Sequence, residues 1–97
     1  MKKLTLRITN VADQDLDDLY TTGFTTWGMA QADRYYDGLL ERFERICEHP
    51  KMYPAVDDIR EGYRRSVYEK HAIYYGIDND AVEIRAVVKY QDVAGRP

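Results

Sequence analysis

The sequence predicts an α+β fold in the order β-α-α-β-β-β, with a mainly antiparallel sheet and a two-helix hairpin packed on one face. Three patterns predict it. Apolar and polar residues alternate over residues 4–8, apolar residues recur at three- and four-residue steps over residues 29–48, and three strand-like runs follow Gly62. Packing two amphipathic helices on one face of a sheet buries the apolar side of both layers. The chain has 97 residues, so residues 1–97 are expected to form one domain around one core.

The first strand and the first helix are predicted near the N-terminus. The alternation over residues 4–8 has the period of a half-buried strand. Asn10 then offers a helix N-cap, and Asp13 lies in the first turn, where the helix dipole favours an anion. Gly23 is expected to weaken this helix, and Gly28 to end it.

The second helix is predicted over residues 29–48, whose opposite face carries charged side chains. Pro50 stops it, because the residue before a proline disfavours helical backbone angles. A short link containing Gly28 joins the two helices, so they are expected to form an antiparallel hairpin. Trp27 lies beside that link, and we expect it to pack the hairpin turn against the sheet.

Three strands are predicted after Gly62, over residues 63–68, 70–77 and 82–90. Residues 78–80, Asp-Asn-Asp, separate the last two and indicate a hairpin turn, because Asn and Asp tolerate positive φ. The three runs are therefore expected to form an antiparallel meander.

Charge is distributed unevenly along the chain. Residues 11–49 carry nine acidic side chains against three arginines, whereas from residue 51 onward both signs number eight. A protein that grips a nucleic-acid backbone normally carries a basic patch, because phosphate neutralisation supplies most of the affinity. With a net charge of −3, direct nucleic-acid binding is not expected, and only the second half suits a polyanion.

Several other classes of protein are not expected from the composition. No stretch approaches the roughly 20 apolar residues of a membrane span, and no signal-peptide core follows Met1, so we expect a cytoplasmic protein. The lone Cys47 is interpreted as a small apolar residue on a helix face. Asp57 and Asp58 lack a third ligand, so no metal or cofactor is expected. Nine tyrosines against two phenylalanines favour half-buried surfaces and interfaces.

Several short patterns occur in a recognisable order along residues 4–92. Trp27-Gly28 precedes the second helix, His49-Pro50 closes it, and Gly62-Tyr63-Arg64 opens the sheet meander. The further matching residues are Ala12, Asp15, Leu16, Leu19, Gln31, Ala32, Tyr35, Leu39, Phe43, Met52, Ile59, Arg60, Glu61, His71, Ile73, Tyr74, Tyr75, Ile84 and Arg85. In this order the patterns resemble the ParE branch of the ParE/RelE toxin superfamily.

The resemblance implies the toxin of a type II toxin–antitoxin system, which inhibits DNA gyrase by binding it. It also implies a ParD-like antitoxin that neutralises the toxin in a hetero-oligomer. Two alternatives stay open: a RelE-like ribosome-dependent mRNA endoribonuclease, and a non-toxic protein-binding module of the same fold. The chain departs from the family at Val87, Val88 and Gln91, where members often carry leucine, histidine and methionine. This departure affects the identity of the target more than the fold.

Two sets of candidate contact residues follow. The target-binding set lies in the half of the chain without acidic excess: Arg64, Arg85, Lys89, Tyr90 and Asp92. The antitoxin-binding set comprises apolar and tyrosine side chains of the hairpin and sheet: Leu16, Leu19, Tyr20, Tyr36, Leu40, Phe43 and Tyr74. The resemblance implies that the antitoxin supplies a C-terminal segment, which folds as it docks.

No catalytic residue is assigned. A ribonuclease would need groups that activate a ribose hydroxyl, protonate a leaving oxygen and stabilise a crowded phosphate. The candidates are Arg64, Arg65, His71, Tyr75, Arg85, Lys89 and Tyr90. Alternation places His71 on the strand face of Ile73 and Tyr75, which favours a structural role, and it places Arg64 and Arg65 on opposite faces. Because the cations are expected to scatter between two faces, we expect a binding inhibitor rather than an enzyme.

Overall fold

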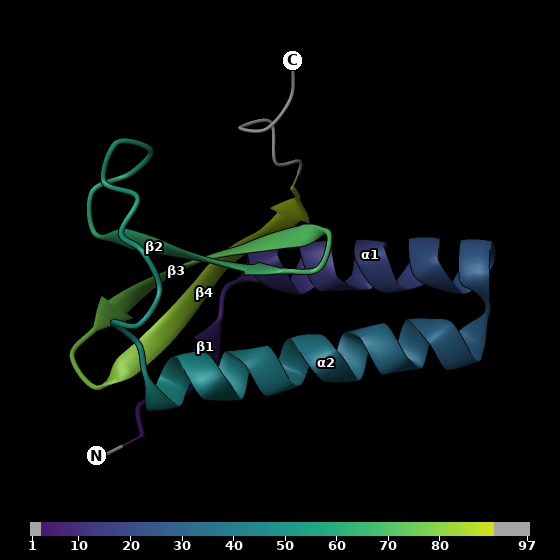
Figure 1. The fold of residues 1–97 in the computed structure, drawn as a ribbon, viewed down its shortest axis with the longest axis horizontal. Helices are drawn as coiled ribbons and strands as arrows, with labels where there is room; N and C mark the ends of the chain where they lie inside the picture. The colour runs from purple at the N-terminus through teal and green to yellow at the C-terminus, as the bar shows by residue number, and fades with distance from the viewer. Residues whose placement is uncertain (1–2, 91–97) are drawn as a thin grey trace.

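The computed structural model describes residues 3–90, and its elements follow the predicted order (Figure 1). The elements are β1 (Thr5–Ile8), α1 (Asn10–Trp27), α2 (Met29–Glu48), β2 (Tyr63–Tyr68), β3 (His71–Asp78) and β4 (Ala81–Lys89). The three strands predicted after Gly62 begin and end within a residue of these bounds. The predicted α+β fold is confirmed.

The four strands form one sheet in the order β1-β4-β3-β2. β2, β3 and β4 make the predicted antiparallel meander. β1 lies at the far edge and runs parallel to β4, with Thr5 opposite Ala81 and Ile8 opposite Ile84. The sheet is therefore mainly antiparallel, as predicted, with one parallel pair between the first and last strands.

α1 is continuous over its 18 residues and passes through Gly23 without a break. Gly23 lies where α1 approaches α2, and a Cβ built there would be 3.6 Å from the Cβ of Ala32. The N-cap is Thr9 and not Asn10, since the Thr9 hydroxyl accepts a hydrogen bond from the Ala12 amide at 3.1 Å. The prediction missed the cap by one residue because both residue types are good caps.

α2 has the predicted bounds, and Gly28 turns the chain between the helices with a φ of 92°. The closed end of the hairpin extends beyond the sheet (Figure 1). Trp27 therefore has no strand to pack against and is 71% exposed. The expectation that Trp27 packs the turn against the sheet is wrong.

The core lies between the helices and one face of the sheet. Its buried residues are Ala12, Leu16, Leu39, Phe43, Ile46, Cys47, Ile73, Tyr75, Val82, Ile84 and Val87. Cys47 is buried on the inner face of α2, as predicted, and burial raises the pKa of its thiol. Within residues 3–90, neither helix has the length and apolar character that a membrane span requires.

Candidate functional site

One face of the sheet is left uncovered by the helices. The residues that pack toward the helices alternate with residues that point the other way, and the register places the outward residues of neighbouring strands side by side. We call the uncovered side the open face. Its charged and aromatic residues are Arg7, Arg60, Tyr63, Arg65, Tyr74, Asp78, Glu83, Arg85 and Tyr90.

A β-bulge in β4 lies at Arg85. On β3, Tyr74 pairs with Ala86 while Tyr75 pairs with Ile84, so Arg85 has no partner. Ile84 is fully buried and Val87 nearly so, although they are three residues apart. Strict alternation cannot bury both, because every second residue faces the same side. Alternation from Ile84 places Arg85 outward, and the extra residue of the bulge restores the inward phase at Val87.

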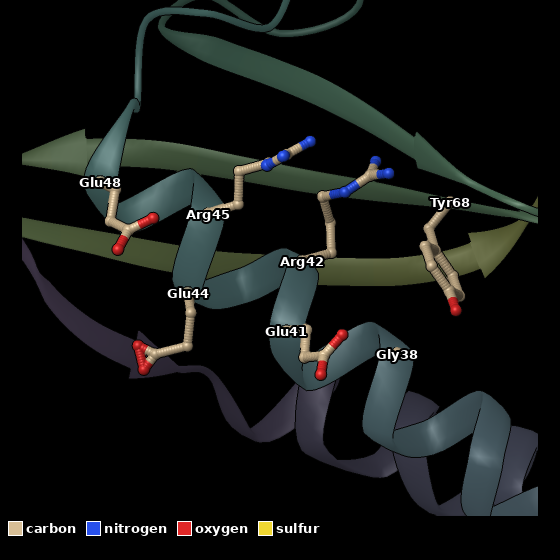
Figure 2. Close-up of a pocket in the computed structure, with 7 residues that line it drawn as sticks. All are labelled: Gly38, Glu41, Arg42, Glu44, Arg45, Glu48 and Tyr68. Carbon is tan, nitrogen blue, oxygen red and sulfur yellow. The ribbon is translucent and has the colours of Figure 1, made fainter.

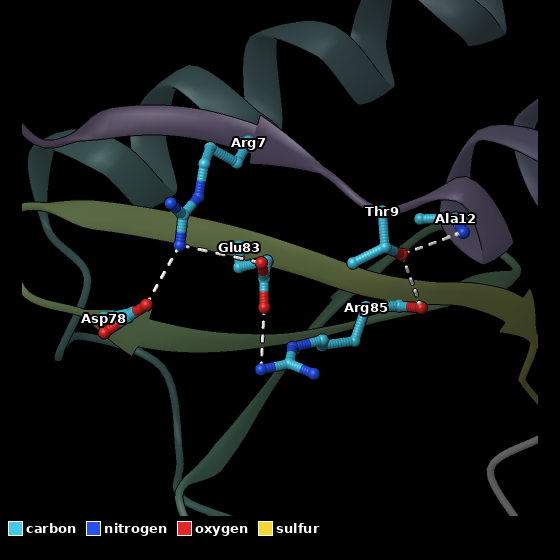
Figure 3. Close-up of polar contacts among 6 residues, drawn as sticks. All are labelled: Arg7, Thr9, Ala12, Asp78, Glu83 and Arg85. Atoms are coloured by element: carbon cyan, nitrogen blue, oxygen red, sulfur yellow. Dashed lines mark hydrogen bonds and ion pairs between the residues drawn. The ribbon is translucent and has the colours of Figure 1, made fainter.

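A chain of ion pairs crosses the open face from β3 to β1 and β4 (Figure 3). Arg7 contacts Asp78 at 3.0 Å and Glu83 at 3.6 Å. Glu83 also contacts Arg85 at 2.6 Å. Arg7 thus lies between acids from two strands, Glu83 lies between two cations, and the pair with Glu83 orients the Arg85 guanidinium along the sheet.

Arginine–tyrosine stacks extend the open face toward β2. The guanidinium carbons of Arg85 and Arg60 lie 5.5 and 5.7 Å from the centre of the Tyr63 ring. Arg65 lies over the Tyr90 ring at 5.2 Å. Four arginines (Arg7, Arg60, Arg65 and Arg85) therefore converge on one face, whose strands carry two acids, Asp78 and Glu83. The candidate cations of the sequence analysis do scatter as predicted, since Arg65 and Arg85 lie on this face while Arg64 and Lys89 lie on the helix side. Arg7 from β1 and Arg60 from the loop before β2 were not among those candidates, and they complete the group on the open face.

The predicted target-binding residues are divided between the two faces. Arg85 and Tyr90 lie on the open face. Arg64 faces the helix side, where its guanidinium donates to the backbone oxygens of Tyr53 at 2.7 Å and Lys51 at 3.4 Å. Lys89 is paired with His71 across β3 and β4 and lies on the same side as that ring. Asp92 lies outside the described residues.

The predicted antitoxin-binding residues are also divided. Leu16 and Phe43 are 1% and 0% exposed, so they offer a partner no surface and belong to the core. Tyr74 lies on the open face, away from the hairpin. Leu19, Tyr20, Tyr36 and Leu40 keep part of their surface exposed. The sequence pattern showed that the helical residues lie on apolar helix faces. It could not show which of them the sheet buries and which remain exposed.

Tyr20 organises an exposed aromatic cluster on the hairpin. Its ring meets Tyr36 edge-on at 5.7 Å and lies 6.4 Å from Phe24. Its hydroxyl donates to Asp33 at 2.6 Å, and this bond raises the pKa of Tyr20. The cluster links α1 to α2 on the side of the closed end, where the hairpin extends beyond the sheet.

Sequence reasoning missed three exposed residues at the closed end: Phe24, Trp27 and Met29, which are 47, 71 and 60% exposed. We define the hairpin surface as Tyr20, Phe24, Trp27, Met29, Tyr36 and Leu40. Phe24 could have been found from its four-residue step after Tyr20, which places both on one helix face. Neighbouring exposed apolar side chains of this kind mark interaction sites.

His71 connects α2 to the sheet on the helix side. Its Nδ1 lies 2.7 Å from the Tyr35 hydroxyl, which also accepts from the Lys70 amide at 3.3 Å. Burial, and then the charge of Lys89, lower the pKa of His71. The ring therefore lies on the face opposite Arg65 and Arg85, which supports its structural interpretation.

Tyr75, another ribonuclease candidate, is also enclosed on the helix side. Its hydroxyl donates to the Pro50 carbonyl at 2.6 Å, and burial raises the pKa of Tyr75 to about 12. Within residues 3–90, no three His, Cys, Asp or Glu side chains are grouped so that they could hold a metal ion. The described residues of the open face provide cations and aromatic rings but no histidine.

A groove of about 400 Å³ lies between α2 and β2 (Figure 2). It is lined by Gly38, Glu41, Arg42, Glu44, Arg45, Glu48 and Tyr68. The Arg42 guanidinium lies between the Tyr53 and Tyr68 rings, at 5.6 and 5.4 Å, and donates to Ser66 Oγ and the Val67 carbonyl, both at 2.9 Å. These contacts fasten α2 to the edge strand, so Arg42 has a structural role in this groove.

Comparisons with known proteins agree with this fold. Residues 6–92 match the family model of the ParE toxin of the type II toxin–antitoxin system parDE. Toxin ParE1 of Caulobacter vibrioides is 37% identical over 71 residues, which cover 73% of this chain and 74% of that protein. Toxin ParE1 of Mycobacterium tuberculosis is 28% identical over 69 residues, which cover 71% of this chain and 70% of that protein.

Two solved structures share the fold. The chromosomal ParDE system from P. aeruginosa gives a TM-score of 0.81 at 15% identity, covering 92% of this chain and 98% of that one. The toxin–antitoxin complex RelBE2 from Mycobacterium tuberculosis gives 0.68 at 23% identity, covering 95% and 97%. The family match spans β1 to the last strand and includes the residues of both exposed surfaces. The chain therefore belongs to the ParE toxin family of type II toxin–antitoxin systems.

Proposed function

We propose that this toxin acts in the cytoplasm by binding DNA gyrase, with no covalent chemistry of its own, and that a ParD-like antitoxin neutralises it. The observation that carries the proposal is the open face, on which four arginines and three tyrosines converge in a chain of net charge −3. A local basic patch on an acidic protein steers it to an acidic surface of a partner. Arginine and tyrosine are also the residue types that carry most binding energy at protein interfaces.

The distribution of the polar groups supports binding rather than cleavage. General acid–base catalysis needs a proton donor or acceptor within hydrogen-bond reach of the reacting atoms. His71 and Tyr75 are enclosed on the helix side, across the sheet from Arg65 and Arg85. The four arginines of the open face are thus separated by the sheet from His71, while Arg64 on the helix side donates to the backbone oxygens of Tyr53 and Lys51.

A second candidate function, ribosome-dependent mRNA cleavage, gains support from the same four arginines. Cationic side chains interleaved with aromatic rings also suit single-stranded RNA, since phosphates pair with arginine and bases stack on tyrosine. The described open face would then need its proton donor from the ribosome or the substrate. The experiment below separates this candidate from gyrase binding.

The test measures two activities of the purified toxin: inhibition of plasmid supercoiling by gyrase, and mRNA cleavage on translating ribosomes. We expect inhibited supercoiling and intact mRNA. Arg85→Ala should weaken the inhibition by at least about tenfold, as for an arginine in the centre of an interface. Arg34→Ala is the matched control, because it removes the same charge from an exposed position on α2. If the toxin cut mRNA and left supercoiling normal, the ribonuclease function would replace gyrase binding as the proposed function.

We assign antitoxin binding to the hairpin surface. Its apolar residues suit an amphipathic segment, and Asp33 and Asp37 on α2 favour basic side chains in that segment. A disordered segment that folds on docking gains its affinity from covering such apolar side chains. The hairpin surface and the open face are different regions. In this proposal the antitoxin binds the first and the target binds the second.

The antitoxin surface is tested by titrating the toxin with the antitoxin encoded beside its gene. Trp27→Ser should weaken binding by about tenfold or more, since exposed tryptophans are frequent centres of binding energy. Val67→Ser is the control, because Val67 is also apolar and exposed but lies on β2. Equal losses for the two variants would contradict the assignment of the hairpin surface.

A further inference from the structure

The bulge that exposes Arg85 is held from the opposite side of the sheet by the start of α1. Three bonds join the two segments. The Thr9 amide donates to the Ile84 carbonyl at 3.1 Å, the Thr9 hydroxyl donates to the Arg85 carbonyl at 3.2 Å, and the Val87 amide donates to the Asp15 carboxylate at 3.0 Å. The bonds therefore fall on the bulged residue and on both of its flanks.

Thr9 serves two structures with one hydroxyl group. Its proton goes to the Arg85 carbonyl, while its oxygen accepts from the Ala12 amide and caps α1 (Figure 3). A hydroxyl can donate once and accept twice, so both bonds form together. The N-terminus of α1 and the bulge are thus linked by a single side chain.

Asp15 supplies what the bulged strand lacks. The Tyr90 amide donates to Lys70 on the β3 side, so alternation turns the Val87 amide to the other edge of β4, where β1 has ended and the Asp15 carboxylate accepts its hydrogen bond. A buried amide without an acceptor is costly, so the carboxylate favours the bulged register over a regular one. Asp17, two residues further along α1, is exposed.

The register determines where the Arg85 guanidinium lies. If the pairing of Val87 with Ile73 continued toward Ile84 without the extra residue, Arg85 would lie opposite Tyr75 and point to the helix side. In the bulged register Arg85 points outward, stacks on Tyr63 and pairs with Glu83. We propose that Thr9 and Asp15 are positioning residues, which hold the β4 bulge and thereby place Arg85 on the open face. The effect on toxicity rests on the proposed function, whereas the effect on the bulge does not.

The structural part is tested by amide hydrogen exchange. In Asp15→Ala, exchange of the Val87 amide should rise by about tenfold more than exchange of the Phe43 amide in α2, because the loss of one bond opens the bulge locally. Asp15→Asn keeps an acceptor oxygen and should restore most of the protection. Asp17→Ala removes the same charge from α1 and should leave Val87 unchanged. An equal rise at Val87 and Phe43 in Asp15→Ala would mean global destabilisation and would overturn the proposal.

Thr9 variants separate helix capping from the bulge. Thr9→Ser keeps both bonds, whereas Thr9→Asp keeps a capping acceptor but has no proton for the Arg85 carbonyl. The readout is the Arg85 side-chain NMR signal, which the Tyr63 ring shifts in the stacked geometry. We expect the shift to persist in Thr9→Ser and to be lost in Thr9→Asp with α1 still helical. A retained shift in Thr9→Asp would contradict the role of the Thr9 proton.

The functional part is tested by a double-mutant cycle on growth inhibition in cells that lack the antitoxin. Asp15→Ala should reduce toxicity in the wild-type background and cause no further loss when combined with Arg85→Ala. Equal losses in both backgrounds would show that Asp15 does not act through Arg85 and would overturn the proposal. If Arg85→Ala alone remained fully toxic, the proposed target face would fail, and hydrogen exchange would still decide whether Thr9 and Asp15 hold the bulge.

Discussion

The two ends of the helical hairpin use similar side chains for different purposes. At the end that lies against the sheet, Leu39, Phe43 and Ile46 of α2 are buried. At the closed end, beyond the sheet, Phe24 and Trp27 remain exposed (Figure 1). An apolar helix face stabilises the fold only where another layer covers it. The apolar side chains of α2 that stabilise the fold of this toxin therefore lie at the sheet end of the hairpin, and those of the closed end remain available to a partner.

The largest expected effect tests the covered half. Phe43→Ala should lower the free energy of unfolding by about 3–5 kcal/mol, because the vacated space cannot be refilled by its neighbours. Chemical denaturation measures this loss. Leu40→Ala, on the same helix but at an exposed position, should cost clearly less. A similar loss for both variants would break the distinction between covered and uncovered side chains.

The next effect concerns Gly38, where the edge strand β2 touches α2. A Cβ at this position would lie 2.7 Å from Cζ of Tyr68, so the ring would have to move away from Tyr35 and Arg42. We expect Gly38→Ala to destabilise the protein by about 1–3 kcal/mol, although alanine favours a helix. The same substitution in a Tyr68→Ala background should be neutral or stabilising. Thermal unfolding of the four proteins checks this reversal.

A smaller effect is expected from pH at His71. Burial and the charge of Lys89 lower its pKa in the folded protein below 6.5. Its contribution to stability is therefore fully present above pH 6.5 and is lost as the pH falls from there through the folded pKa. His71→Gln should remove this part of the pH dependence, as measured by denaturation across the weakly acidic range. A variant that keeps the full acid sensitivity would locate its origin in other groups.

Gly23 should show the opposite sign from Gly38. A Cβ added at Gly23 would lie 3.6 Å from the Cβ of Ala32, an ordinary contact, so an added methyl group has space. Gly23→Ala should raise the free energy of unfolding by about 0.5–1 kcal/mol through helix propensity alone. The shift in thermal midpoint measures the gain. Destabilisation would mean that the helices approach more closely at the closed end than this distance indicates.

The smallest effect on stability is expected at the closed end itself. Trp27→Ser removes a side chain that is 71% exposed, so the free energy of unfolding should change by no more than about 0.5 kcal/mol. Denaturation of the isolated toxin measures this. A large loss would show that Trp27 stabilises the fold and would weaken the comparison between the two ends.

Local patterns were enough to predict the elements. The bounds of α2 could be predicted because its apolar spacing and Pro50 act over a few residues. The meander followed from three short strands separated by turn residues. Candidate contacts were harder to predict. Leu16 and Leu40 both lie on apolar helix faces, and only the position of the sheet makes one of them core and the other surface.

The order of elements, the length of α2 and most core positions follow from the amino-acid sequence, because periodicity and helix stops depend on neighbouring residues. Long-range contacts, in contrast, set the parallel pairing of β1 with β4, the bulge at Arg85 and the position of Arg7, Arg60 and Arg85 on one face. These features join segments that are separated by many residues. Their register depends on bonds such as that between Asp15 and Val87, which no local pattern specifies.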